Sequence, residues 1–187
     1  MKKTIITAAL VAIVGGVAPS AFAADGKIAF KGLVNDVTCS VTGGAGTDGA
    51  AKDFTVTLDT VSKTALAVAG ARAGDKAFSV QVGGAGEAGC TNGKLVSLKF
   101  EPAQSPVDSA TGRLINQAGT GAAEFVQIGL LDKEGADINL VDGSGNPVAT
   151  IAGNTATLDY FAQYYAAKEG VTSGTVDTFV MYSAGYN

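Results

Sequence analysis

The sequence contains no histidine and no tryptophan, and it has only two cysteines and four prolines among 187 residues. Without histidine the chain cannot form a Ser-His-Asp triad or a Cys-His catalytic pair, and it lacks imidazole as a metal ligand. Charge is also sparse, since 13 Lys and Arg against 17 Asp and Glu leave a formal net charge of −4. This balance argues against nucleic-acid binding, which requires a basic surface to neutralise phosphates.

Glycine, in contrast, is abundant. The chain has 26 glycines, which is roughly twice the average usage of about 7%. Many glycines with few prolines are typical of short strands joined by tight turns, and a hydrophobic content of 47% is too high for a disordered chain.

The first 23 residues have the pattern of a secretory signal peptide. Lys2 and Lys3 precede an almost unbroken apolar run over residues 4–18, and residues 21–23 (Ala-Phe-Ala) match an Ala-x-Ala cleavage site. The apolar run is shorter than the roughly 20 residues that span a bilayer. Cleavage after residue 23 leaves 164 residues, and the loss of both lysines changes the net charge from −4 to −6. We therefore expect an exported, soluble, single-domain product without stable membrane insertion.

The two cysteines, Cys39 and Cys90, lie 51 residues apart in this exported chain. An even cysteine count in an oxidising compartment predicts a disulfide. The spacing excludes a catalytic C-x-x-C motif, and two cysteines without histidine leave too few ligands for a structural metal site. We expect one intramolecular disulfide, no metal and no cofactor.

Several segments alternate apolar and polar residues with a period of two, which is typical of half-buried strands. The segments are residues 28–34, 54–58, 78–82, 96–100, 126–130 and 176–186. Turn-forming residues such as Gly43-Gly44, Gly83-Gly84 and Asn92-Gly93 separate them. Short strands with this spacing predict an all-β fold, an antiparallel β-sandwich.

Two segments are less clear. Residues 158–165 fit a helix face and a strand face equally well, and their aromatic content favours a strand. Residues 62–71 are rich in alanine and are compatible with a helical turn or a loop.

Apparent functional motifs have simpler interpretations. Residues 44–49 and 84–89 both match G-x-G-x-x-G, but neither begins a helical pattern, so we interpret both as turns rather than nucleotide sites. Asp132, Asp137 and Asp142 lack the spacing of an EF-hand, and we interpret them as solvated turn carboxylates. No nucleophile with its base and no clear pair of catalytic acids is recognisable, so we expect no enzyme activity.

The two ends of the mature sequence are the most informative. Residues 26–32 (Gly-Lys-Ile-Ala-Phe-Lys-Gly) form an alternating segment ahead of Cys39. Gly174 is the fourteenth residue from the C-terminus, and Tyr186 is the penultimate one. With the signal peptide and two cysteines, these features resemble the pilin subunits of chaperone–usher fimbriae, type 1-like major pilins above all. The side chains that share the register of Tyr186 are Val176, Val180, Tyr182 and Ala184.

The resemblance implies an incomplete immunoglobulin-like sandwich, residues 36–187, that lacks its last strand and is completed by donor-strand complementation. In this family a periplasmic chaperone first lends a strand to the open groove. After handling by an outer-membrane usher, the N-terminal extension of another subunit replaces that strand. The product is a linear polymer of this or related pilins, in a fimbria on the cell surface.

Carried onto this chain, the resemblance assigns residues 24–35 to the donor strand. Its inserting residues are Ile28, Phe30, Gly32 and Val34, with Gly32 placed where the groove is shallow. The edge of the groove that receives chaperone or donor is assigned to Gly174, Val176, Val180, Tyr182 and Tyr186.

One other class of protein remains open. A secreted monomeric carbohydrate-binding β-sandwich fits the composition equally well, but it does not explain the features at the two ends. A tip adhesin is disfavoured because 164 residues leave no room for an additional lectin domain.

Overall fold

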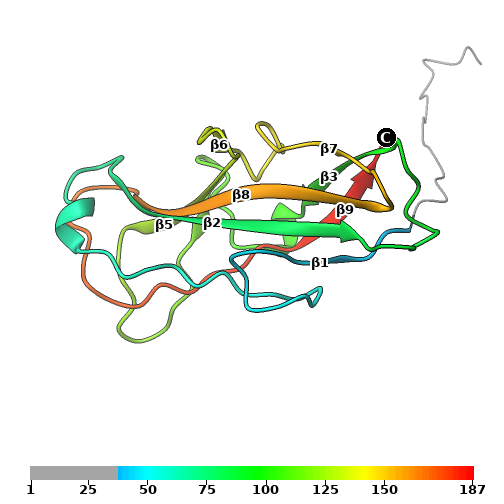
Figure 1. Cartoon of the computed structure of the whole chain (residues 1–187). Helices are drawn as coiled ribbons and strands as arrows, with labels where there is room; N and C mark the ends of the chain where they lie inside the picture. Colours follow the sequence, from blue (N-terminus) through cyan, green and yellow to red (C-terminus); the bar gives the residue numbers. More distant parts are fainter. Residues whose placement is uncertain (1–37) are drawn as a thin grey trace, which may run out of the picture. The chain divides into compact units, whose positions relative to one another are not determined.

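Two antiparallel β-sheets enclose the hydrophobic core of residues 38–187, the part of the chain that the computed structural model describes (Figure 1). The larger sheet has the strand order β1 (Val41–Gly43), β2 (Arg72–Gly83), β8 (Thr155–Ala166), β5 (Val126–Leu131) and β4 (Leu114–Ile115), and β6 (Asp137–Ile138) pairs with β5. The smaller sheet has the order β7 (Ala149–Thr150), β3 (Leu95–Phe100) and β9 (Tyr182–Tyr186). The predicted antiparallel β-sandwich is confirmed, while the signal peptide and residues 24–35 lie outside the described residues.

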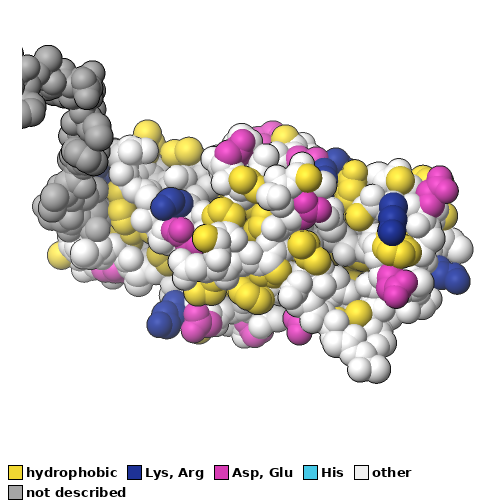
Figure 2. Space-filling view, turned by 180° about the vertical axis from the view of Figure 1, so that it is seen from behind, with side chains coloured by type: hydrophobic (Ala, Val, Ile, Leu, Met, Phe, Trp, Pro, Cys, Tyr) yellow, Lys and Arg dark blue, Asp and Glu magenta, His cyan; other side chains and the backbone are white. Residues whose placement is uncertain are grey.

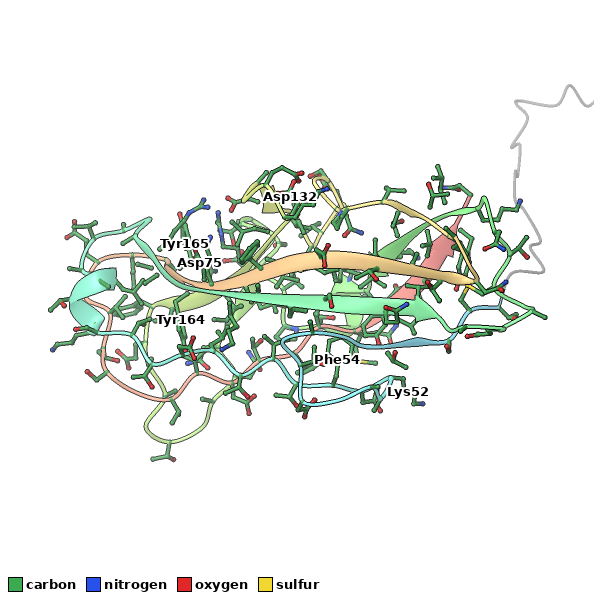
Figure 3. The ribbon with its side chains drawn as sticks, viewed as in Figure 1. Lys52, Phe54, Asp75, Asp132, Tyr164 and Tyr165 are labelled. Carbon is green, nitrogen blue, oxygen red and sulfur yellow. A yellow bond between two sulfur atoms is a disulfide. The ribbon has the colours of Figure 1, made fainter. Side chains whose placement is uncertain are left out.

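The long strands β2 and β8 form the centre of the larger sheet. They pair over most of their length, with Phe78 opposite Tyr160. The side chains of Tyr164 and Tyr165 point to opposite sides of β8 (Figure 3). This alternation confirms the predicted strand over residues 158–165, because a helix would not place consecutive aromatic residues on opposite faces.

The core is sealed where aromatic side chains from both sheets meet. Tyr160 is 1% exposed and stacks on Phe78 with 5.3 Å between ring centroids, and Phe100 of β3 meets Tyr160 edge-on at 6.4 Å. The Tyr160 hydroxyl donates to Oδ1 of Asn146 at 3.2 Å, so this buried polar atom is paired. Burial raises the pKa of Tyr160.

The predicted disulfide is confirmed: Cys39 and Cys90 are bonded within the chain. The bond joins the segment before β1 to the loop that follows β2. Cys90 is fully buried, so the cross-link is anchored in the core.

Strand predictions were confirmed where a neighbouring strand is present. Residues 78–82, 96–100 and 126–130 lie in β2, β3 and β5. Residues 54–58 were predicted as a strand but join no ladder, and within the predicted strand 176–186 only β9 is paired. Both unpaired segments border the same groove, so neither has a neighbouring strand there. The predicted strand over residues 28–34 lies outside the described residues.

The segments between strands follow the predictions with one exception. Residues 44–49 and 84–89 are turns and bends that open no helix, and residues 62–71 contain one 3₁₀ turn, Lys63–Leu66. Asp132 and Asp142 each accept backbone N–H groups of their own turns. Asp137 was predicted to be a solvated turn carboxylate, and that was wrong, because it lies in β6 within a cluster of arginines.

Asp137 connects β6 to two distant parts of the chain. Arg72 donates to both of its carboxylate oxygens at 2.7 Å, and Arg113 donates to Oδ2 at 3.0 Å. The Arg113 guanidinium also lies 3.8 Å from the centre of the Tyr165 ring. Partial burial by itself raises the pKa of Asp137, but the hydrogen bonds and charges of the two arginines outweigh it and hold that pKa below its ordinary value.

Candidate strand-binding groove

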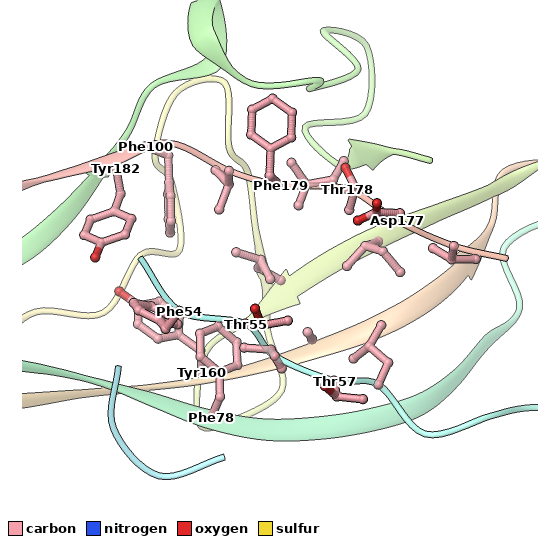
Figure 4. Close-up of a pocket in the computed structure, with 18 of the residues that line it drawn as sticks. Phe54, Thr55, Thr57, Phe78, Phe100, Tyr160, Asp177, Thr178, Phe179 and Tyr182 are labelled. Atoms are coloured by element: carbon pink, nitrogen blue, oxygen red, sulfur yellow. The ribbon is translucent and has the colours of Figure 1, made fainter. Parts of the chain in front are cut away.

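An apolar groove of about 540 Å³ runs between residues 54–58 on one side and residues 176–182 on the other (Figure 4). Both sheets contribute to it, and most of its lining side chains are hydrophobic. They include Phe78, Val80, Ile128 and Tyr160 from the larger sheet and Leu98 and Phe100 from the smaller sheet.

Both edges of the groove have the side-chain pattern of strands. On the first edge Phe54, Val56 and Leu58 are half-buried, whereas Thr55 and Thr57 are exposed. On the second edge the even-numbered residues 176, 178 and 180 are half-buried, and the odd-numbered residues between them are exposed. Each edge therefore turns one face of a strand toward the core.

The backbone of the second edge is unpaired on its groove side. The N–H and C=O groups of Val176, Thr178 and Val180 have no hydrogen-bond partner among the described residues. The backbone of Asp177 and Met181 is bonded on the opposite side, to the chain between β3 and β5. Since backbone groups of successive residues in a strand point to opposite sides, the unpaired set faces the groove.

Strand β9 continues this free edge. It pairs with β3 on one side and has no strand on the other among residues 38–187. Leu95 and Asn187 exchange both backbone hydrogen bonds at 3.0 Å, which fixes the odd-numbered residues of β9 as those bonded to β3. The even-numbered backbone groups of β9 therefore point away from β3.

The first edge has a similar deficit. Thr55 is tied to Asp48, because Asp48 N–H donates to the Thr55 carbonyl at 3.1 Å and Thr55 N–H donates to Oδ1 of Asp48 at 2.7 Å. Phe54, Val56 and Leu58 have no backbone hydrogen bond to any other described residue. A row of unpaired groups on each side of an apolar floor is the geometry that accepts an additional strand.

The structure brings together only some of the residues predicted for the groove edge. Val176, Val180 and Tyr182 line the groove. Tyr186 lies farther along β9, opposite Val96 and packed against the core. Gly174 lies outside the groove, where a β-carbon would collide with the backbone of residues 121–123. The predicted donor residues Ile28, Phe30, Gly32 and Val34 lie outside the described residues.

Other residues that shape the groove were missed. The Tyr182 hydroxyl donates to the carbonyl of Lys52 at 2.5 Å, and the side chains of Ser105 and Asn116 bind the backbone of the second edge from outside. They lie in loops without a periodic pattern, so nothing in the sequence marks them.

The groove offers little for catalysis or metal binding. Among residues 38–187 no group of three or more His, Cys, Asp or Glu side chains could hold a metal ion. No helix in the described part of the chain has the length and apolarity needed to cross a membrane. Hydrophobic side chains are exposed across the middle of one face of the molecule (Figure 2), and Phe179 on the outer side of the second edge is 53% exposed.

The fold and the groove thus define an antiparallel β-sandwich with one open, apolar edge. The family described as "FimA: Type-1 fimbrial protein, A" matches residues 58–187. The chain is 39% identical over 175 residues to the major fimbrial subunit SMF-1 of Stenotrophomonas maltophilia (strain K279a), with 90% of this chain and 96% of that protein covered. It is 40% identical over 166 residues to the F17 fimbrial protein of Escherichia coli, with 87% of each covered. The chain therefore belongs to the type-1 fimbrial protein family, and it is an exported structural subunit of a cell-surface fimbria.

Solved structures support the fold. The crystal structure of the P pilus rod subunit PapA aligns with a TM-score of 0.55 at 21% identity, covering 80% of this chain and 99% of that one. A structure of a chaperone–usher pilus, described as revealing the molecular basis of rod uncoiling, aligns with a TM-score of 0.53 at 19% identity, covering 91% and 100%. The all-β, immunoglobulin-like fold predicted from the sequence is thereby confirmed.

Proposed function

We propose that this subunit polymerises by donor-strand exchange, with residues 24–35 of one copy occupying the groove of another. The observation that carries the proposal is the groove itself, an apolar floor between two strand-like edges whose inner backbone groups are unpaired. An inserted strand would pair with both edges and cover the floor, which removes an exposed surface that favours aggregation.

The chemistry of residues 24–35 suits this role. Their alternation places Ile28, Phe30 and Val34 on one face, and burying each side chain would contribute about 1.5–3 kcal/mol before backbone hydrogen bonds form. Gly32, on the same face, would fit where the groove is too shallow for a side chain.

The same groove explains the other proposed partners. Before assembly it would be covered by a strand of a periplasmic chaperone, and an outer-membrane usher would bring subunits together. The role is structural, so it requires no enzyme activity, no cofactor and no nucleic acid. A monomeric carbohydrate-binding role is the weaker candidate, because a sugar site requires converging polar groups and this groove is lined mainly by apolar side chains.

The test is to express Phe30→Asp in cells that contain the chaperone and usher. A carboxylate in the apolar groove costs several kcal/mol unless it is protonated or paired, so the variant should form the chaperone complex normally but no fibres. Ala29→Asp is the matched control, since it places the same charge on the opposite face of the extended segment and should leave fibres intact. A deletion of residues 24–31 should reproduce the first phenotype.

Fibres of normal length from Phe30→Asp would refute the proposal. Loss of the chaperone complex in the deletion variant would also contradict it, because residues 24–31 would then belong to the subunit's own core.

A further inference from the structure

Asn116, just after β4, uses every hydrogen-bonding position of its side-chain amide. Its Nδ2 donates to the carbonyls of Ala123 at 2.9 Å and Thr175 at 3.0 Å. Its Oδ1 accepts from the N–H groups of Asp177 at 2.9 Å and Ala118 at 3.0 Å. An amide has two donors and two acceptor lone pairs, so this half-buried side chain is fully satisfied.

These bonds hold the second groove edge from its outer side. Two of them attach directly to Thr175 and Asp177, and the N–H of Gln117 adds a bond to the Asp177 carbonyl at 2.6 Å. At the other end of the edge, Ser105 Oγ accepts from the N–H of Met181 at 2.9 Å. Side chains here occupy the place of a neighbouring strand.

The consequence concerns the side of the edge that faces the groove. Because the outer backbone groups of Thr175 and Asp177 are bonded, Val176 and Thr178 keep their unpaired groups directed inward. A slip by one residue would turn Asp177 toward the apolar floor and break all of these outer bonds.

We infer that Asn116 is a positioning residue that holds the groove edge extended, with its inner backbone groups free, before a strand enters. This inference rests on the proposed strand exchange. It makes the edge preorganised, so the incoming strand does not have to order it during docking.

The experiment compares Asn116→Ala with the parent chain in two measurements. The first is the rate at which a synthetic peptide of residues 24–35 displaces the chaperone from the purified chaperone–subunit complex. We expect uptake to be roughly tenfold slower in Asn116→Ala, the factor that corresponds to about one net hydrogen bond. Ser105→Ala should slow uptake in the same direction, and it provides the test if Asn116→Ala fails to fold.

The second measurement separates positioning from general destabilisation. It uses a self-filled chain, in which residues 24–35 are appended after Asn187 through a flexible Gly/Ser linker. Hydrogen exchange of Asn116→Ala in this form should show lost protection at the Asp177 amide. The amides of Val176, Thr178 and Val180 should stay protected, because the inserted strand now binds them.

Asn139→Ala is the matched control, because Asn139 Oδ1 only accepts from Val141 N–H within a turn away from the groove. Equal uptake by Asn116→Ala and the parent, or equal slowing by Asn139→Ala, would overturn the inference. Uniform loss of protection at residues 176–180 would overturn it as well. If the parent complex takes up no peptide at all, the proposed strand exchange itself fails, which is a distinct result.

Discussion

The Tyr182 hydroxyl reaches across the groove to the main-chain carbonyl of Lys52, at 2.5 Å, and joins the two edges at one end. The Tyr182 ring lies 6.0 Å from the ring of Phe54, which follows Lys52 on the other edge (Figures 3 and 4). A strand that enters the groove and continues along β9 has to displace this contact.

Removing that hydroxyl should therefore ease strand entry. We expect Tyr182→Phe to take up the peptide of residues 24–35 severalfold faster, by up to roughly tenfold, because one hydrogen bond no longer has to break. The ring remains, so packing against Phe54 is kept. Peptide displacement of the chaperone measures the rate. Tyr186→Phe, outside the groove, should exchange at the parent rate, and an unchanged rate in Tyr182→Phe would show that the contact does not limit entry.

Gly174 should be intolerant of any side chain. A β-carbon there would lie 2.5 Å from the Gly121 carbonyl oxygen and would also collide with the backbone of Ala122 and Ala123. We expect Gly174→Ala to lower the free energy of unfolding by about 1–3 kcal/mol in urea titrations of the self-filled chain. Gly119→Ala is a suitable control, since a β-carbon at that position meets nothing within 4 Å. Equal stability of the two variants would contradict this role of Gly174.

The disulfide should contribute strongly to stability. Closing a loop with a sequence separation of 51 residues restricts the unfolded chain, and the chain-entropy model gives about 4 kcal/mol for a loop of this size. We expect the double variant Cys39→Ala, Cys90→Ala to lose about this amount in urea unfolding of the self-filled chain. A loss well under about 1 kcal/mol would mean that the bond does not restrict the unfolded state as the model requires.

Stability at acid pH should depend on Asp137. Its pKa in the folded chain lies below the ordinary value of 3.8, so the ionised carboxylate stabilises the fold above that value. This contribution is lost as the pH falls through the lowered pKa. Since the side chain is partly exposed, we expect about 1 kcal/mol or less. The Asp137→Asn variant should unfold with a weaker pH dependence below pH 4, whereas Asp159→Asn, on β8 outside this cluster, should follow the parent. Identical acid titrations of Asp137→Asn and the parent would contradict the assignment.

The alternation of Val176 and Val180 was visible in the sequence, as was that of Phe54 and Leu58. It identified both groove edges correctly as segments with one apolar face. It could not show that these segments lack a ladder, because side-chain periodicity reports burial and not backbone pairing. The buried strands β2, β3, β5 and β8 were predictable for the same reason, since each has a neighbour on both faces of its apolar pattern.

The polar contacts of the site were beyond the reach of sequence reasoning. Asn116 and Ser105 act through single hydrogen bonds to a segment roughly 60 to 80 residues away, and such contacts leave no local pattern. Asp137 was misjudged because its arginine partners come from β2 and the loop before β4, which only the fold brings together. Gly174 was recognised by its distance from the C-terminus, but the reason for a glycine there, a close backbone approach, appears only in three dimensions.

The most direct test of strand exchange is to locate Phe30 in assembled fibres. A photo-crosslinking amino acid replaces Phe30 in subunits labelled with ¹⁵N, and these are co-assembled with unlabelled subunits that carry Phe30. After irradiation, mass spectrometry identifies the peptide attached to position 30. We expect attachment to residues 54–58 or 176–182 of unlabelled subunits, which proves that the contact is between copies. Attachment confined to the labelled subunit itself, or to residues outside the groove, would contradict the exchange of residues 24–35 between subunits.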